Sequence, residues 1–216
     1  MDLTQQLLSF LGPIVNTLAI SVLSFLFGML LGLPLAFVRA YQKRAGILVD
    51  AFEKFFRGVP EAVLMLMFYL GVGLYIPFPF TSPFFTAIFV LSLRSAANQS
   101  QIFRGAIRGV GEEQMAAARS LGFSKMGSIL HVITPQIFIY STPGLGNEYA
   151  LLIKDSAYAF AIGVIDIMKR ADLIRSATYD LVMPYMIAAV LYIMLTFPVA
   201  TWLDTWGSRR KKKLGL

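Results

Sequence analysis

Apolar residues occupy long uncharged blocks of the chain, and short charged segments separate these blocks. No charged residue occurs from Pro13 to Val38, from Ala62 to Leu93 or from Leu181 to Leu203. A helix needs about 20 residues to cross a bilayer, and a run of 18 or more apolar residues favours a membrane span over a buried helix of a soluble protein. The pattern predicts an all-α membrane protein with one transmembrane domain over residues 1–216 and five spans, near 13–38, 59–76, 84–103, 132–153 and 183–206.

Two further segments have helical patterns but are not expected to cross the membrane. Residues 47–57 alternate apolar and charged positions at helical spacing, which predicts a helix along the cytoplasmic face. Residues 155–180 are mostly polar but contain an apolar stretch, "AYAFAIGVIDIM". We expect there an outer-surface or re-entrant helix that packs over the bundle, since irregular backbone at membrane depth must be covered by protein or line a water-filled cavity.

Composition narrows the classes of chemistry open to the chain. Hydrophobic residues make up 57% and charged residues only 14%, well below the roughly one quarter of a soluble domain. Cysteine is absent, which excludes disulfides and thiolate chemistry, and the single histidine, His131, cannot form a metal site alone. The first apolar run lacks a preceding basic region and a following A-x-A pattern, so we expect a retained span and no removed signal peptide.

The distribution of the positive charge predicts orientation in a membrane. The formal net charge is +7, and 14 of the 19 Lys and Arg residues fall in three polar segments on one predicted side. Five lie between the first two spans, four in the loop after the third, and five in the tail "SRRKKK". The positive-inside rule therefore predicts an outer N-terminus and a cytoplasmic C-terminus. We assign the charge to orientation and lipid attraction, with no nucleic-acid partner.

The longest cytoplasmic loop, residues 104–131, has the pattern of two short helices. Glu112 and Glu113 favour a helix start, because negative charge is stabilised at a helix N-terminus. Gly122 is typical of a helix stop, and a second helix can follow Ser124. Small residues at 116–118 allow another surface to approach closely. Such a loop is longer than a simple connection needs, so it is shaped either to contact a cytoplasmic partner or to rest as an amphipathic helix on the membrane.

Four motifs along residues 50–175 resemble the ABC importer permeases, and most narrowly the polar amino-acid uptake permeases. The loop is similar to their cytoplasmic pattern EAA-x3-G-x9-I-x-L-P from Ala116 through Gly122 to Pro135. "FFRGVP" at 55–60 and "QIFRGAIRGV" at 101–110 are similar to F-x-R-G-T-P and E-I-x-R-G-A-I-x-S-V. "PGLGNEYALLIKDSA" at 143–157 is similar to the family segment that ends in I-K-D-T-S.

The resemblance implies a type I ABC importer permease fold in a bacterial or archaeal cytoplasmic membrane. It implies a second permease, identical or related, two cytoplasmic ATPases that bind the ATP, an extracytoplasmic amino-acid-binding protein, and no cofactor on this chain. The ATPase would dock on the loop helix, through Glu112, Glu113, Ala116, Ala117, Ala118, Leu121 and Gly122.

The chain departs from the family pattern at three positions. Ala116 stands where the family has the carboxylate that anchors the loop to the ATPase, and Glu112 or Glu113 could replace it from one turn upstream. Gln101 stands in place of an acidic residue and Val59 in place of a threonine. Because Gln101 is neutral, we do not infer a cationic substrate.

No energy source is encoded in the chain itself. The stretch nearest to a P-loop, "GFSKMGSI" at 122–129, has no lysine after its second glycine. Five spans do not divide into the repeated halves typical of secondary transporters. An intramembrane enzyme is the alternative from another class, but the spans contain no His pair, no Ser with a base and no H-E-x-x-H. A non-catalytic permease driven by a partner ATPase is the consistent interpretation.

The substrate path is expected near the middle of the fourth span. Pro143 removes a helix hydrogen bond, which predicts either a break at a binding site or a packing kink. A zwitterionic amino acid needs an acceptor for its ammonium group, for which Glu148 is the candidate, and a cation for its carboxylate, for which Arg94 is the candidate. The predicted path comprises Arg94, Asn98, Gln101, Asn147, Glu148, Lys154 and Asp155.

Alternatives remain for several of these positions. Arg94 could instead form a structural pair with Glu148 or Glu61, and Lys154 and Asp155 could gate entry or be ordinary interfacial residues. The pattern "GMLLG" at 28–32 predicts helix packing. The predicted cargo is a polar amino acid such as glutamine, arginine or histidine. The alternative is a permease of the same architecture for methionine or another small solute, which an apolar pocket would favour.

Overall fold

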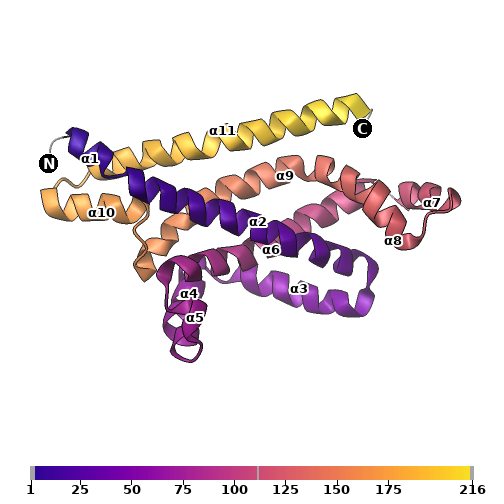
Figure 1. Ribbon diagram of the computed structural model, residues 1–216, viewed down its shortest axis with the longest axis horizontal. Helices are drawn as coiled ribbons and strands as arrows, with labels where there is room; N and C mark the ends of the chain where they lie inside the picture. Colours follow the sequence, from indigo (N-terminus) through magenta and orange to yellow (C-terminus); the bar gives the residue numbers. More distant parts are fainter. Residues whose placement is uncertain (1–2, 111, 215–216) are drawn as a thin grey trace.

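Long helices run between two opposite ends of the molecule in the computed structural model, which describes residues 3–110 and 112–214 (Figure 1). They are α2 (Leu11–Tyr41), α6 (Pro83–Val110), α9 (Thr134–Asp155) and α11 (Met183–Leu214), and the short α1 (Leu3–Leu8) precedes them. The N-terminus lies at the end that carries α10 and the C-terminus at the end that carries α7. The helical class is therefore confirmed, and all regular elements of the described chain are helices.

The centre of the fold is the close contact of α2 with α6. A Cβ atom added at Gly28 would lie 2.6 Å from the Ser95 hydroxyl, and one at Gly32 would lie 2.9 Å from the Ala96 carbonyl oxygen. Both distances are shorter than real Cβ contacts, so only glycine allows the two helices to pack this closely. The helix-packing interpretation of "GMLLG" is confirmed.

The second predicted span, 59–76, differs from the expected straight helix. Helix α3 (Lys43–Gly58) comes first, and the chain then bends by 101°. After the bend follow α4 (Glu61–Leu66), a π-helical turn (Met67–Gly71) and a 3-10 turn (Val72–Leu74). The helix breaks at Val59, whose backbone is extended at φ −95° and ψ 131°. Pro60 disfavours the α conformation in the residue before it, which explains the bend. The short α5 (Pro77–Phe80) follows and leads to α6.

Helix α3 also differs from the expected surface helix at 47–57, because it packs beside α2 and α6 (Figure 1). Its buried positions are Gly46, Val49 and Glu53, spaced by three and four residues. These positions form one face, which explains the packing. Glu53 is the polar member of this face, and it meets polar partners on α6 that local periodicity cannot indicate.

The predicted break at Pro143 does not occur, since α9 continues through this residue. Proline cannot donate to the Ile139 carbonyl oxygen, four residues earlier. The Thr142 hydroxyl donates to that same oxygen at 2.8 Å. A side chain thus satisfies the acceptor that proline leaves open, and the helix stays whole. The irregular backbone lies earlier, in a π-helical turn at Ile129–Ile133.

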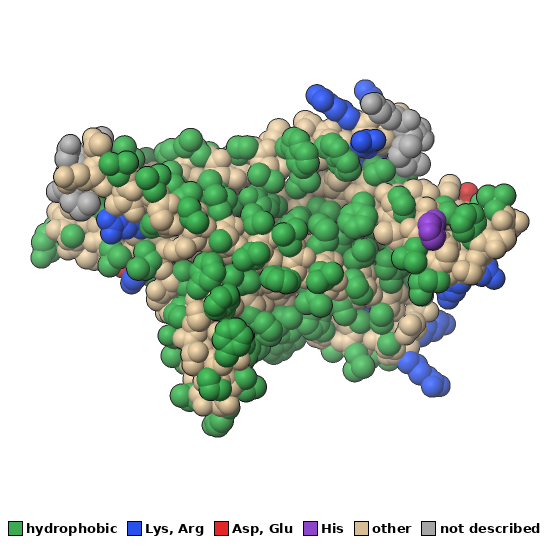
Figure 2. Space-filling model, viewed as in Figure 1, with side chains coloured by type: hydrophobic (Ala, Val, Ile, Leu, Met, Phe, Trp, Pro, Cys, Tyr) green, Lys and Arg blue, Asp and Glu red, His purple; other side chains and the backbone are tan. Residues whose placement is uncertain are grey.

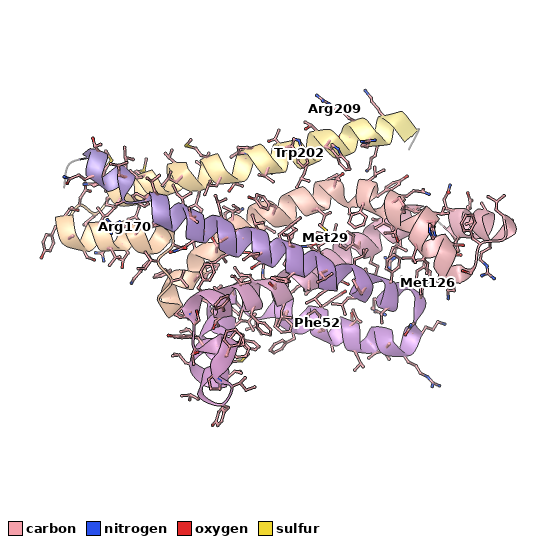
Figure 3. All side chains as sticks on the ribbon, in the orientation of Figure 1. Met29, Phe52, Met126, Arg170, Trp202 and Arg209 are labelled. Carbon is pink, nitrogen blue, oxygen red and sulfur yellow. The ribbon has the colours of Figure 1, made fainter. Side chains whose placement is uncertain are left out.

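The predicted outer segment, 155–180, contains a 3-10 helix (Ser156–Ile162) and α10 (Ile167–Thr178). Two hydrogen bonds attach its middle to α2: Asn16 donates to the Ile165 carbonyl oxygen at 2.9 Å, and the Thr17 hydroxyl accepts from Ile167 N–H at 3.3 Å. Arg170, labelled in Figure 3, donates to the Ser9 hydroxyl at 2.9 Å. The expected helix over the end of the bundle is confirmed.

Length and composition identify fewer spans than the five predicted. Among the described residues, Thr4–Tyr41 and Met183–Lys212 are long and apolar enough to cross a membrane, and α3 with Glu61–Leu74 gives a third if the bent pair counts as one span. The five-span topology therefore stays a prediction. Figure 2 shows Lys and Arg side chains gathered at the end with α7 and the α11 C-terminus, a smaller group near α10, and a mainly hydrophobic surface between them.

Candidate functional site

Two features of the molecule carry its candidate chemistry. One is a set of polar clusters between α3, α4, α6 and α9, and the other is the helix α7 (Glu112–Ser120) at the end opposite α10. The first polar cluster is centred on Glu53 of α3, whose side chain is 1% exposed. Its carboxylate accepts from the Ser100 hydroxyl at 2.7 Å and from the Gln101 amide at 3.0 Å, and Arg104 lies 3.3 Å away. Gln101 therefore holds a buried carboxylate of α3.

The second cluster is centred on Arg94 of α6, with a carboxylate on each side. Its guanidinium forms ion pairs with Glu61 of α4 at 2.5 Å and with Asp155 of α9 at 2.7 Å. All three side chains are less than one fifth exposed. Buried pairs of this kind are costly to break, because removing one partner leaves a charge uncompensated. The pair of Arg94 with Glu61 matches the structural alternative for this arginine.

The third cluster lies one helical turn further along α6 and contains the free acceptor. Asn98 accepts from Arg57 Nε at 2.8 Å and donates to Glu148 Oε2 at 3.0 Å. Glu148 is 1% exposed, and Ser95 of α6 also lies close to its carboxylate. Its second oxygen, Oε1, does not reach full hydrogen-bond geometry with any described residue. Arg57 is exposed. The Asn98 amide therefore lies between the exposed guanidinium of Arg57 and the buried carboxylate of Glu148.

The structure brings only some of the predicted path residues together. Arg94, Asn98, Glu148 and Asp155 belong to the two adjoining clusters on α6 and α9, and Gln101 belongs to the Glu53 cluster. Asn147 and Lys154 are exposed, and Lys154 lies close enough to the neighbouring Asp155 to act on its charge. Sequence reasoning assigned no role to Glu53 or Arg57. For Arg57 a signal was present, since it is the arginine of the "FFRGVP" motif.

Helix α7 ends as its sequence predicts. Gly122 has a left-handed backbone with φ +86°. Its N–H bonds to the Arg119 carbonyl oxygen at 3.0 Å, and Phe123 N–H bonds to the Ala118 carbonyl oxygen at 3.2 Å. This pair of bonds is a Schellman stop, which favours glycine at the left-handed position. The Ser124 hydroxyl then accepts from Gly127 N–H at 3.0 Å and begins α8 (Lys125–Ser128).

The surface of α7 is largely open. Ala118 is buried, whereas Glu112, Glu113, Ala116, Ala117 and Gly122 are exposed, and Leu121 is 79% exposed. Residue 111, within the predicted loop 104–131, lies outside the described residues. Glu112 and Ala116 line one hollow of about 780 Å³ between α7 and the ends of α2 and α6. The carboxylate of Glu112 is thus on the same face as the position where the family has its acidic residue.

A helical bundle with a predominantly hydrophobic surface, polar clusters inside and a small-residue helix exposed at its basic end is the architecture of a membrane transport subunit. The chain belongs to the family of binding-protein-dependent transport system inner membrane components, whose model matches residues 24–213. Members of this family are membrane components of transporters.

Curated relatives are similar over most of the chain. The arginine ABC transporter permease protein ArtQ of Haemophilus influenzae is 35% identical over 188 residues, which cover 83% of this chain and 83% of that protein. The nopaline transport system permease protein NocM of Agrobacterium fabrum is 31% identical, over 88% of this chain and 83% of that protein. The resemblance to amino-acid permeases is confirmed.

Solved structures show the same fold. A chain from the crystal structure of an amino acid ABC transporter with histidines has a TM-score of 0.82 and 29% identity, covering 97% of this chain and 99% of that one. A chain of the MetNI methionine ABC transporter in an inward-facing form has a TM-score of 0.81 with 18% identity, covering 97% and 99%. At that identity the second likeness supports the fold alone.

Proposed function

We propose that the chain is the transmembrane subunit of an ATP-driven importer that carries a polar amino acid across the cytoplasmic membrane. The observation that carries this proposal is the Arg57–Asn98–Glu148 cluster, in which Glu148 is 1% exposed and one of its carboxylate oxygens lacks a well-formed hydrogen bond with the described residues. A buried acceptor without a partner costs free energy, and an incoming ammonium group would satisfy it. The polar amino-acid relatives support the same class of cargo.

In this proposal the three groups of the cluster bind different parts of the amino acid. Glu148 accepts the ammonium group, Arg57 pairs with the carboxylate, and Asn98 fixes the two side chains relative to one another. Arg94 is already paired with two carboxylates, so its role is to hold α4, α6 and α9 together at the outer end of the path. The exposed Asn147 and Lys154 would contact the cargo on its way in, beside Asp155.

Coupling to ATP hydrolysis is assigned to α7. The exposed residues Glu112, Glu113, Ala116, Ala117, Leu121 and Gly122 form the surface on which the ATPase docks, and Ala118 secures the helix to the bundle. Glu112 supplies the carboxylate that the family has at the position of Ala116, since the two residues share a face. The working assembly contains two permeases, identical or related, two ATPases and an extracytoplasmic binding protein, all around this membrane subunit.

Methionine transport is the alternative, and the composition of the interior disfavours it. A site for the methionine side chain would be lined by apolar groups, whereas Arg57, Asn98 and Glu148 meet between α3, α6 and α9. The MetNI likeness supports the fold only. Uptake of labelled amino acids by liposomes containing the assembled complex tests the proposal directly. We expect ATP-dependent uptake of one or more polar amino acids, and uptake of methionine alone would contradict it.

The substitution Glu148→Gln tests the ammonium site. It removes the charge but keeps the shape and an oxygen that can accept from Asn98. Because a charge-assisted hydrogen bond is lost, we expect transport to fall by roughly tenfold or more while the complex still assembles. The matched control is Asp180→Asn. Asp180 is exposed and caps α11, and the asparagine that replaces it has an amide oxygen that can still accept these hydrogen bonds. Equal transport by the two variants would reject Glu148 as the acceptor.

A further inference from the structure

The hollow beside α7 contains a group of arginines that the transport path does not use. It lies between the C-terminal ends of α2 and α6 and the start of α7, with a volume of about 780 Å³. Arg39 comes from α2, and Arg104 and Arg108 come from α6. We call this space the arginine hollow and define it by Arg39, Tyr41, Arg104, Arg108, Glu112 and Met115.

The charges of the arginine hollow are only partly compensated. Arg39 pairs with Asp50 at 3.6 Å, and Arg104 pairs with Glu53 at 3.3 Å, both from α3 behind the hollow. Arg108 is exposed and forms no ion pair with the described residues. Glu112 is the one acid among the residues that line the hollow. Asp50 also pairs with Lys54 at 2.7 Å, so four cations, Arg39, Lys54, Arg104 and Arg108, share three acids, Asp50, Glu53 and Glu112. Guanidinium groups bind phosphate in a bidentate manner.

The position and walls of the hollow indicate the source of the phosphate. The hollow lies where α2 and α6 end, among the basic side chains gathered at the α7 end of the molecule (Figure 2). Met126 of α8 and Arg209 of α11 lie toward the same end (Figure 3). Tyr41, Ile107 and Met115 supply apolar wall beside the arginines. A soluble phosphate compound gains little from such a wall, whereas the glycerol and upper acyl region of a lipid would pack on it.

We propose that the arginine hollow binds the phosphate headgroup of an anionic phospholipid from the cytoplasmic leaflet. The proposal rests on the proposed function only in placing this end of the molecule at the cytoplasmic membrane surface. Basic pockets at this level are suited to anionic headgroups, and each arginine near the surface adds to the attraction. Because Glu112, Met115 and Ala116 of α7 line the hollow, a bound lipid would also fix the position of the docking helix.

The test compares lipid binding by single-charge variants of the full chain in detergent micelles. The probes are fluorescent phosphatidylglycerol and fluorescent phosphatidylcholine. We expect the unaltered chain to prefer phosphatidylglycerol, and Arg108→Gln to weaken that binding by about fivefold. The control is Arg44→Gln, which removes the same charge from an exposed position near the start of α3, outside the hollow. Glu112→Gln should tighten phosphatidylglycerol binding, because it removes a repelling charge.

Equal weakening by Arg108→Gln and Arg44→Gln would reduce the effect to general charge attraction and overturn the proposal. Competition by free glycerol 3-phosphate at equal concentration would assign the hollow to a soluble phosphate and overturn it as well. So would unchanged lipid binding in Arg108→Gln combined with loss of the ATPase, which would assign the hollow to an acidic segment of that partner. Liposome uptake is measured in parallel, so a failure of the transport proposal is seen separately from the lipid result.

Discussion

The two short helices at opposite ends of the molecule, α7 and α10, are attached in opposite ways. The start of α10 is capped by Asp166, which is fully buried and accepts from Lys169 N–H at 2.8 Å and from the Tyr192 hydroxyl of α11 at 3.2 Å. Nearly the whole surface of α7 is exposed, and its stop and the following cap are formed by its own backbone and Ser124.

The two end helices therefore differ in the contacts that hold them: α10 is held by the bundle, and α7 is held mainly by local contacts. Helix α10 is fixed by buried polar contacts to both α2 and α11, so its position depends on the bundle. Helix α7 has its shape set by local contacts, and its exposed surface is the one to which we assign the proposed ATPase docking. Changes at α10 should therefore alter the stability of the chain, and changes at α7 should alter association.

The largest effect is expected from Gly122→Arg. A left-handed backbone costs a non-glycine residue about 1–2 kcal/mol, and the new side chain would project from the proposed docking surface. We expect the partner ATPase to be lost on co-purification while the permease remains in the membrane.

The matched control is Gly163→Arg at the α10 end. Gly163 has a similar left-handed backbone, with φ +96°, and open space around its Cβ position. It carries the same strain without touching α7, so the ATPase should be retained. Retention of the ATPase by both variants would exclude α7 as the docking helix.

The next effect compares the two helix caps. Asp166→Ala should lower the free energy of unfolding by about 2 kcal/mol, because it removes a cap and leaves the Tyr192 hydroxyl without its acceptor. Ser124→Ala removes an exposed cap at the other end and should cost about 0.5–1 kcal/mol. Thermal unfolding in detergent measures both. Similar losses would show that the two ends are held equally.

The smallest effect is a dependence of stability on pH. Burial raises the pKa of Asp166 to about 6, and hydrogen bonds from Lys169 N–H and the Tyr192 hydroxyl partly offset this. The folded state thus holds a proton that the unfolded chain releases near pH 4. The resulting stabilisation is fully present below about pH 4 and is lost as the pH rises through about 6, on the order of 1 kcal/mol between pH 5 and 7.

Asp166→Asn should flatten this pH dependence, because asparagine caps a helix but does not titrate. The measurement is the unfolding temperature of both chains between pH 5 and 7.5. A slope that is unchanged by the substitution would assign the pH dependence to another group.

Elements with local causes could be predicted from the sequence. The start of α7 at Glu112, its stop at Gly122 and the start of α8 after Ser124 follow from capping chemistry within a few residues. The long helices follow from uncharged runs. The family follows from motifs that lie in order along the chain, and none of these inferences needs a long-range contact.

Elements with distant causes could not be predicted. The partners of Glu53 lie 47 residues and more away on α6, and Asn98 joins Arg57 to Glu148 across three helices. The helical pattern of α3 is compatible with a membrane surface or with a polar partner, and only the contacts with α6 decide between them. The candidate site was therefore predicted in part: Glu148 and Asn98 were among the predicted path residues, and Arg57 was not.

The hydroxyl of Thr142 has a consequence for how α9 can change in evolution. It fills the place of the backbone donor missing at Pro143, and it also lies where a side chain at Gly207 of α11 would have to go. The residues allowed at positions 142, 143 and 207, on two helices, therefore all depend on the position of this one hydroxyl group. Replacing Pro143 would make Thr142 dispensable and free it to move aside for a larger residue at 207. Substitutions at these three positions should therefore have non-additive effects on stability.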